Sequence, residues 1–507
     1  MGLASVIVFN KNILFNSFLK IMKISLFLTI FITTITSHAA APVQKHVVRI
    51  NSTLQKWSAS QPWDKSAPSK RRALGVTMPN NQILTTAEMA ADATYIELEN
   101  ADGNRTIPAK VVAIDYEANL ALLAADNGDT DGFFKTLSPI KLGGGAKIGD
   151  KVSVWQLEDN GVPLITEVTI QSADIVSSFA QGHYFLTYEA KGSMQSASSS
   201  YSLPVIKDGK LLGLLTSYNS KDQITDVLAP EIIAAFLADV KDGNYVGFPS
   251  LGIGVSNTVD PNFRAWLKLP DDVGGIYVTH VRKDSPAEKS GTLKGDVIIE
   301  IDGKEIGRRG YYTDAQYGKL FWSHQVRGIH KVGDQVEITI LREGQRKILT
   351  AILKRPGKRL VPAYTYDTAP KFLVKGGFIF QELTATYLKA FGKDWQSKAP
   401  LDLLDVLRSP DDYEAGRNRI VFLSAAVPTP ATTGYERMRN LIIAKVNGKD
   451  IADIPSLVKA FQAPGSDGLH TIEFADGNPK TIYLDASVSD MVDGQLLKRG
   501  IPILSRE

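Results

Sequence analysis

The chain has 507 residues and a formal net charge of +3, with 44% hydrophobic and 22% charged residues. This length allows about three domains, and the composition is that of an ordinary globular protein. The charge is too small for the chain's size to indicate nucleic-acid binding. The absence of cysteine excludes disulfides, thiol nucleophiles and cysteine-ligated metal centres.

The first 41 residues are typical of a signal peptide. Their apolar stretch covers only residues 24–35, whereas a membrane-spanning helix needs about 20 residues. Met22-Lys23 supplies a charged start, for which Met22 is a better initiator than Met1, and Ser37-His38-Ala39 supplies the small residues of a cleavage site. We expect an exported, periplasmic protein without a stable membrane span after cleavage, with an uncleaved anchor as the alternative.

Residues 43–245 are predicted to be rich in β-strands, because short apolar stretches alternate with polar turns that contain Gly and Pro. Evenly spaced short strands favour a sandwich or barrels. A helix is predicted over residues 230–237, with Pro230 at its start, and residues 241–244 are predicted to be a linker. The predicted strands include Val47–Ile50, Ala109–Ile114, Lys151–Leu157 and His183–Thr187.

Two later segments share a pattern. Residues 298–306 read IIEIDGKEI, and residues 442–451 read IIAKVNGKDI. Asp-Gly and Asn-Gly between apolar stretches are strong signals for a hairpin with a type I′ turn. The repetition suggests a duplicated domain, with two unrelated hairpins as the alternative.

The first copy contains four further motifs: Pro249–Gly254, Gly275–Val278, Asp284–Ala287 and Leu293–Asp296. With these motifs it resembles a PDZ domain of the HtrA/Deg protease type. The resemblance implies that backbone N–H groups of Leu251, Gly252 and Ile253 bind the C-terminal carboxylate of a peptide, which adds as a strand to a sheet edge. The alternative is a plain β-turn.

Further motifs run along the whole chain: Gly75–Met78, Ile83–Glu88, Val111–Ile114, Asn119–Leu123, Ile148–Asp150, Pro204-Val205, Asp208–Gly213, Gly376–Phe380, Gly434–Glu436 and Ile501-Pro502. With these motifs the front half is similar to the trypsin-like domain of the same family, in its plant-type Deg branch with two PDZ domains. The implied fold is mostly β: a trypsin-like double β-barrel domain over residues 43–245, then PDZ-like α/β domains over 248–355 and 356–505.

The resemblance also locates the catalytic triad, and all three positions differ from the family pattern. The family's His base falls at Glu88, its Asp at Asn119 and its Ser nucleophile at Tyr201. A serine nucleophile needs a base that accepts and returns a proton near neutral pH, as imidazole does. The loop Ser199–Leu203 also has no glycine, so an oxyanion hole is doubtful there.

Residues 192–202 carry extra residues, so the nucleophile can be shifted to Ser198, Ser199, Ser200 or Ser202. Such a shift of the alignment would provide a serine nucleophile but no His to act as its base. Lys191 could form a Ser–Lys dyad, although its spacing does not indicate one. His183 lies in a predicted strand and is interpreted as structural.

We therefore expect an exported pseudoprotease that binds exposed C-termini or unfolded polypeptide through its first PDZ domain, as a chaperone or adaptor. The alternative is an ATP-independent serine endopeptidase that uses the shifted Ser. The resemblance implies a homo-oligomer, a trimer or larger. Neither a cofactor nor a metal is expected: residues 143–150 lack the Lys-Ser/Thr of a P-loop, and His324 and His330 do not share a helix face.

Overall fold

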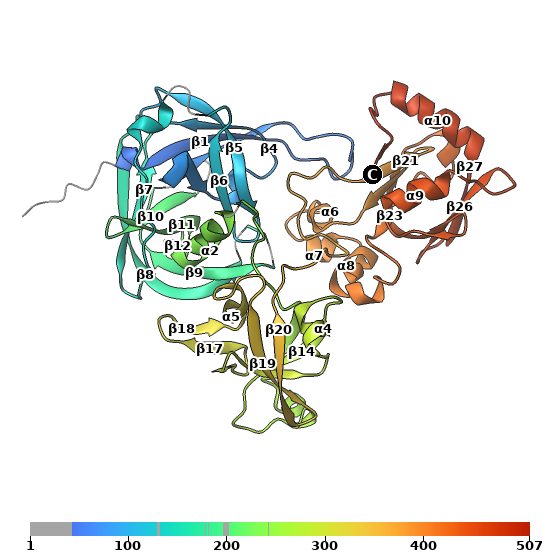
Figure 1. The fold of residues 1–507 in the computed structure, drawn as a ribbon. Helices are drawn as coiled ribbons and strands as arrows, with labels where there is room; N and C mark the ends of the chain where they lie inside the picture. Colours follow the sequence, from blue (N-terminus) through green and yellow to red (C-terminus); the bar gives the residue numbers. More distant parts are fainter. Residues whose placement is uncertain (1–42, 129–131, 178, 181, 196–201, 242) are drawn as a thin grey trace, which may run out of the picture. The chain divides into compact units, whose positions relative to one another are not determined.

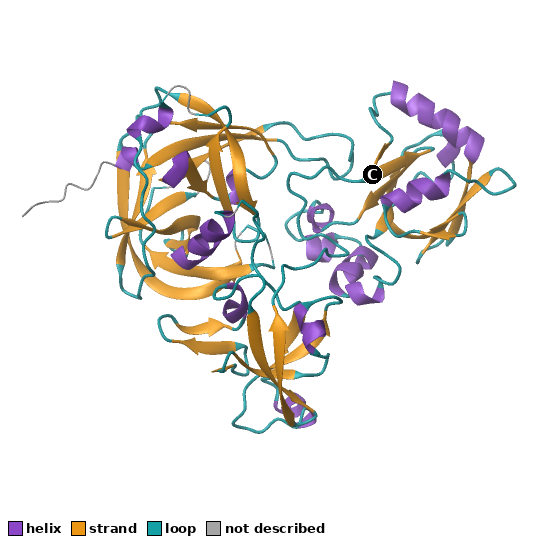
Figure 2. Ribbon diagram, viewed as in Figure 1, coloured by secondary structure: helices purple, strands orange, loops and turns teal. Residues whose placement is uncertain are grey.

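The computed structural model describes residues 43–128, 132–177, 179–180, 182–195, 202–241 and 243–507. The predicted signal peptide lies outside these residues. Strands predominate, as the sequence led us to expect (Figure 2). Within the described ranges, no helix combines the length and apolar character needed to cross a membrane.

The first six strands close into a barrel in the order β1-β2-β3-β6-β5-β4, with all neighbours antiparallel (Figure 1). Its interior is filled by fully buried aliphatic side chains such as Ile50, Ile83 and Leu123. Short 3-10 helices precede, connect or follow the strands: η1 (Val43–Lys45), η2 (Pro79–Asn81), η3 (Ala87–Met89) and η4 (Phe133–Thr136). The strands are β1 (Val47–Leu54), β2 (Ser69–Met78), β3 (Gln82–Thr85), β4 (Ala93–Glu99), β5 (Thr106–Asp115) and β6 (Leu120–Ala125).

The next six strands form a second closed barrel, in the order β10-β11-β12-β9-β8-β7. Helix α2 (Pro230–Val240) follows and buries Ile232, Ile233 and Phe236, so the predicted helix exists and extends three residues further than expected. The strand predicted from His183 begins one residue later. The strands are β7 (Lys151–Leu157), β8 (Pro163–Ser177), β9 (Tyr184–Lys191), β10 (Leu203–Lys207), β11 (Lys210–Asn219) and β12 (Ile224–Leu228).

The third part of the chain is an antiparallel sheet in the order β13-β14-β15-β19-β20, with β16 paired to β15. Strand β13 therefore lies at the edge of this sheet. The strands are β13 (Ile253–Asn257), β14 (Ile276–Val281), β15 (Val297–Ile301), β16 (Lys304–Glu305), β19 (Gln335–Arg342) and β20 (Gln345–Ile352), with a separate hairpin of β17 (Tyr311–Asp314) and β18 (Gly318–Phe321). The helices are α3 (Pro261–Trp266), α4 (Pro286–Ser290) and α5 (Ser323–Arg327).

The last part has a sheet in the order β27-β26-β24-β23-β22-β21-β28, with β25 paired to β24. Its strands are β21 (Phe372–Lys375), β22 (Phe378–Glu382), β23 (Val421–Ala426), β24 (Leu441–Val446), β25 (Lys449–Asp450), β26 (Leu469–Phe474), β27 (Thr481–Asp485) and β28 (Ser505–Arg506). Its helices are α6 (Ala385–Lys389), α7 (Trp395–Lys398), α8 (Leu401–Arg408), η5 (Pro410–Asp412), η6 (Pro430–Thr432), α9 (Ile454–Phe461) and α10 (Ala486–Lys498).

The repeated sequence pattern forms the same hairpin in both sheets. Asp302 and Gly303 have φ of 47° and 69° between β15 and β16, and Asn447 and Gly448 have φ of 51° and 72° between β24 and β25. Positive φ at both central residues is the requirement of a type I′ turn. The hairpin prediction is confirmed at both places.

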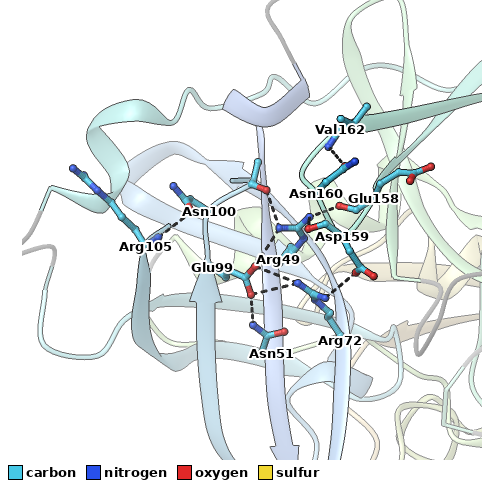
Figure 3. Close-up of polar contacts among 11 residues, drawn as sticks. Arg49, Asn51, Arg72, Glu99, Asn100, Arg105, Glu158, Asp159, Asn160 and Val162 are labelled. Carbon is cyan, nitrogen blue, oxygen red and sulfur yellow. Dashed lines mark hydrogen bonds and ion pairs between the residues drawn. The ribbon is translucent and has the colours of Figure 1, made fainter. Parts of the chain in front are cut away.

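A buried guanidinium links the two barrels. Arg49 on β1 is only 3% exposed and bonds Glu99 and the carbonyl oxygen of Ala101 within the first barrel. It also donates to the carbonyl oxygens of Glu158 and Asp159, in the turn between β7 and β8 of the second barrel (Figure 3). A buried charge needs such complete pairing. Arg49 therefore helps to hold the two barrels, and the cleft between them, in one arrangement.

Candidate functional site

Residues of both barrels line a cavity of about 260 Å³. Glu88 and Asn119, two of the three predicted catalytic positions, belong to the first barrel. The second barrel contributes Val176, Ser177, Phe179, Thr187, Thr216, Ser217 and Asp226. The cavity therefore lies between the two barrels and is lined by side chains from both.

The structure brings Glu88 and Asn119 into direct contact. The Oδ1 of Asn119 accepts a hydrogen bond from the Glu88 backbone N–H at 3.1 Å. Asn119 is buried and has φ of 56°, a left-handed conformation that Asn tolerates better than most residues. Arg71 donates to the Glu88 carbonyl oxygen at 2.9 Å, and its Nη1 lies 3.9 Å from Glu88 Oε2. Neither of these two positions supplies an imidazole.

Of the predicted Ser and Tyr positions, only Ser202 lies within the described residues; Tyr201, Ser199 and Ser200 lie outside them. Ser202 is fully buried. Its Oγ accepts the Thr86 N–H at 3.3 Å and lies 3.1 Å from Thr85 Oγ1, while its carbonyl oxygen accepts the Leu74 N–H at 3.1 Å. These contacts place the Ser202 hydroxyl between the barrels as a packing group, and it is not among the residues that line the cavity.

His183 takes part in a buried ionic network beside this site. Its Nδ1 lies 3.0 Å from Glu117 Oε2 and 3.2 Å from Nη1 of Arg327, the last residue of α5. Arg327 also pairs with Glu117 and lies 4.7 Å above the Phe185 ring. Burial opposes ionisation of Glu117, but the hydrogen bond from His183 and the charge of Arg327 outweigh it and hold the pKa of Glu117 at about 2. The neighbours of His183 are those of a structural residue, in line with its interpretation from the sequence.

The turn between β5 and β6, residues 115–119, carries buried polar side chains that bond several other elements. Of these residues, only Asn119 was singled out from the sequence. The buried Asp115 accepts the Ala118 N–H at 2.6 Å and the hydroxyl of Tyr245, which lies between α2 and β13, at 2.5 Å. Burial raises the pKa of Asp115, and the Tyr245 hydrogen bond opposes this rise. Two acids in five residues at a strand end are the only sequence signal, and surface turns commonly show the same composition.

The predicted peptide-binding loop precedes the edge strand β13. Gly252 has φ of 77°, and a Cβ there would lie 2.4 Å from Ser285 Cβ, so the position requires glycine. Its N–H donates to Ser250 Oγ at 3.1 Å, while its carbonyl oxygen accepts the Arg282 N–H. Leu251 is buried, and Ile253 begins β13. A carboxylate bound at the Gly252 N–H must therefore displace the Ser250 hydroxyl.

Among the described residues, no group of three or more His, Asp or Glu side chains could hold a metal ion. His324 is buried and stacked against Tyr312, and His330 pairs with Asp302 at 2.6 Å.

Two family models match the second half of the chain, and both describe a PDZ domain, over residues 249–353 and 361–502. The chain is 26% identical over 453 residues to "Protease Do-like 2, chloroplastic" of Arabidopsis thaliana, covering 87% of this chain and 72% of the relative. It is 24% identical to "Probable periplasmic serine endoprotease DegP-like" of Marinomonas sp. (strain MWYL1), covering 68% and 70%. Among solved structures, "HtrA-type protease AlgW with decapeptide" matches at 23% identity and a TM-score of 0.46, covering 62% of this chain and 97% of that one.

The two closed barrels with a cavity between them, followed by two PDZ domains, define a PDZ-containing protein with a trypsin-like domain. The motif order, and the similarity to a Do-like protease over 87% of this chain, agree with this architecture. Over most of its length the chain is similar to Do-like proteases, and it carries two PDZ domains.

Proposed function

We propose that this chain is an exported HtrA/Deg-like pseudoprotease that binds exposed C-termini or unfolded polypeptide through its first PDZ domain. The observation that carries the proposal is the contact between Glu88 and Asn119. Glu88 stands at the family position of the His base, and Asn119 at that of the orienting Asp. The Asn119 side-chain oxygen accepts the Glu88 backbone N–H, and Arg71 donates to the Glu88 carbonyl oxygen. Among the described residues that line the cavity there is no imidazole, the group that takes a proton from a serine and returns it to a leaving amine near neutral pH.

The binding function rests on the loop before β13. Gly252 has the left-handed conformation and close packing that only glycine allows, and β13 lies at the end of its sheet. An extended peptide can add to such an edge, with its carboxylate at the loop N–H groups. We propose domain boundaries of 43–245, 248–355 and 356–505 for the three parts, and a homo-oligomer, a trimer or larger, as the assembled form.

The first experiment measures proteolysis and binding with the purified mature chain, residues 42–507. A fluorescent unfolded protein serves as substrate, and a Ser200→Ala, Ser202→Ala double variant runs in parallel. Triad loss costs about 10⁶ in turnover in a model serine protease, so we expect no cleavage by either protein over long incubation. Cleavage by the parent but not by the double variant would overturn the proposal.

Binding is measured separately by the fluorescence anisotropy of peptides with free C-termini. The matched ligand control is the same peptide with an amidated C-terminus, and the matched variant is Gly252→Trp. We expect binding to require both the free carboxylate and Gly252. Equal binding of the amidated peptide would mean that the loop is not the carboxylate site.

The second candidate is an ATP-independent serine endopeptidase with a shifted nucleophile. Family membership and the protease names of the relatives favour it. The buried hydroxyl of Ser202, which bonds the Thr86 N–H, weighs against Ser202 as that nucleophile. The proteolysis assay distinguishes the two candidates directly.

Export and assembly are tested on the expressed full-length chain. Mass spectrometry of the N-terminus detects cleavage after Ala39 or Ala41, and cell fractionation tests whether the product is periplasmic. Light scattering of the mature chain reports the oligomeric state. An uncleaved, membrane-bound product would replace the periplasmic proposal with the single-anchor alternative.

A further inference from the structure

The segment between β20 and β21 carries two tyrosines that pack onto the trypsin-like domain. Residues 364–367, here called the strap, read Tyr-Thr-Tyr-Asp. The ring of Tyr366 stacks on Phe179, with centroids 4.7 Å apart and planes inclined by 16°. The rings of Tyr364 and Tyr366 lie 5.5 Å and 5.1 Å from that of Tyr116. These four rings form one cluster, in which both strap tyrosines are half-buried.

A set of polar contacts fixes the strap at its C-terminal end. The Asp92 N–H donates to Asp367 Oδ1 at 2.7 Å, and the Asp367 N–H donates to Asp92 Oδ1 at 2.9 Å. The Tyr116 hydroxyl also bonds the Asp367 carboxylate. Towards the other end, the Tyr364 hydroxyl lies 3.4 Å from Glu117 Oε1. The strap is thus bound through backbone and side chain at Asp367 and through the side chain at Tyr364, unlike a solvated linker.

The strap contacts the same elements that build the cavity between the barrels. Phe179 lines the cavity, and Tyr116 lies on the turn that carries Asn119. Asp92 follows η3, which carries Glu88. Burial raises the pKa of the Tyr366 phenol; the carboxylates of Asp92 and Glu88 add to this rise, and the guanidinium of Arg71 opposes it.

We propose that the strap covers one side of the cleft that Glu88 and Asn119 line, where Tyr366 stacks on the cavity residue Phe179, and that it restricts the access of other polypeptide until it is displaced. The surface under the strap then accepts an extended segment with aromatic side chains followed by an acid, which is the chemistry of the strap itself. This inference does not use the proposed absence of catalysis. In an inactive protein the strap controls access to a holding cleft, and in an active one it is autoinhibitory.

The absence of cysteine in the chain allows a direct test of access. A single Thr216→Cys substitution places a thiol on the cavity wall, and Ser220→Cys places one on the exposed turn between β11 and β12. The rate of modification by N-ethylmaleimide is measured for each protein. We expect the thiol at 216 to react at least tenfold more slowly than the thiol at 220. Equal rates in the otherwise unaltered chain would overturn the proposal without any strap variant.

The strap is then weakened in both reporter backgrounds by Tyr366→Ala with Asp367→Ala. We expect labelling at 216 to become at least tenfold faster, with labelling at 220 unchanged. Tyr366→Phe is the matched control, because it keeps the ring that stacks on Phe179, and it should label as slowly as the parent. Unchanged labelling at 216 in the double variant would show that the strap is only a packed linker.

A second measurement adds the strap sequence as a separate peptide to the weakened variant, whose folding is checked by circular dichroism. A synthetic peptide of residues 361–369 should slow the labelling at 216 in the weakened variant and leave the labelling at 220 unchanged. The same peptide with Tyr366→Ala should have no effect. Failure of the first peptide to protect the thiol, in a variant that has the parent's circular dichroism, would count against occupation of the cleft.

Discussion

Replacement of Glu117 by Gln tests the buried network that joins the turn beside Asn119 to α5. Glu117 is 7% exposed and pairs with His183 and Arg327. The substitution keeps the shape of the side chain but leaves the Arg327 guanidinium without its buried counter-charge. Removing one partner of a buried pair commonly costs about 3–5 kcal/mol.

The pKa shift of Glu117 gives a second measure of how much ionised Glu117 stabilises the folded protein. Its shift from the ordinary value of 4.5 to about 2 corresponds to about 3 kcal/mol, at about 1.4 kcal/mol for each pKa unit. Because the folded pKa lies below the unfolded value, this stabilisation is present above about pH 4.5 and is lost as the pH falls towards 2. The free energy of unfolding of Glu117→Gln should therefore be about 3 kcal/mol below that of the parent at pH 7, and this difference should shrink progressively below pH 4.5.

The assay is urea unfolding of the mature chain at pH 7 and at pH 3.5, followed by far-UV circular dichroism. A double-mutant cycle with Arg327→Gln separates the Glu117–Arg327 interaction from the rest of the network. We expect a coupling free energy of about 1–3 kcal/mol between these two residues. Glu167→Gln is the control, because Glu167 pairs with Lys151 on the surface and should leave the midpoint unchanged. A reduction of less than about 1 kcal/mol in the free energy of unfolding of Glu117→Gln at pH 7 would refute the reasoning. Strict additivity of the effects of Glu117→Gln and Arg327→Gln on that free energy would refute it as well.

Three further predictions concern single residues. Arg49→Met should lower the free energy of unfolding by about 3–5 kcal/mol in the same urea assay, because it leaves three carbonyl oxygens without their buried donor and leaves Glu99 with only Asn51 and Arg72 as partners. Gly213→Ala should prevent folding or lower the Tm by several degrees in calorimetry, because its Cβ would lie 2.1 Å from a carbonyl oxygen of β12; Gly144→Ala, with open space around it, should do neither. Ser250→Ala should bind C-terminal peptides about two- to tenfold more tightly in the anisotropy assay, because the Gly252 N–H no longer has to exchange a hydroxyl partner for the carboxylate; weaker binding would mean that the hydroxyl contacts the peptide instead.

The features that follow from local chemistry were predictable. Asp302-Gly303 and Asn447-Gly448 adopt the two positive φ angles of a type I′ turn because these residues pay little steric penalty there. Pro230 starts α2 because its fixed φ suits the first turn of a helix and its missing N–H would have no helical partner. The resemblance of ordered motifs supplied the barrels and both PDZ domains, and it identified Glu88 and Asn119 as neighbours before any geometry was known.

Contacts between distant parts of the chain were not predictable from any local pattern. Glu117 and Arg327 are 210 residues apart, and Tyr116 and Asp367 are 251 residues apart. An acid in a turn or a tyrosine in a linker has the same sequence signature whether it faces solvent or a buried partner. Only the packing of α5 and of the strap against the barrels decides which of these side chains are paired.

The sequence by itself thus predicted the strands, the turns and the resemblance to HtrA/Deg proteases, because each depends on residue type at short spacing or on the order of motifs. The tertiary structure alone decided that Ser202 is buried between the barrels, that His183 belongs to an ionic network, and that a segment between the two PDZ domains lies beside the cleft. These outcomes depend on which surfaces meet when the barrels and the PDZ domains fold, and on the desolvation that follows.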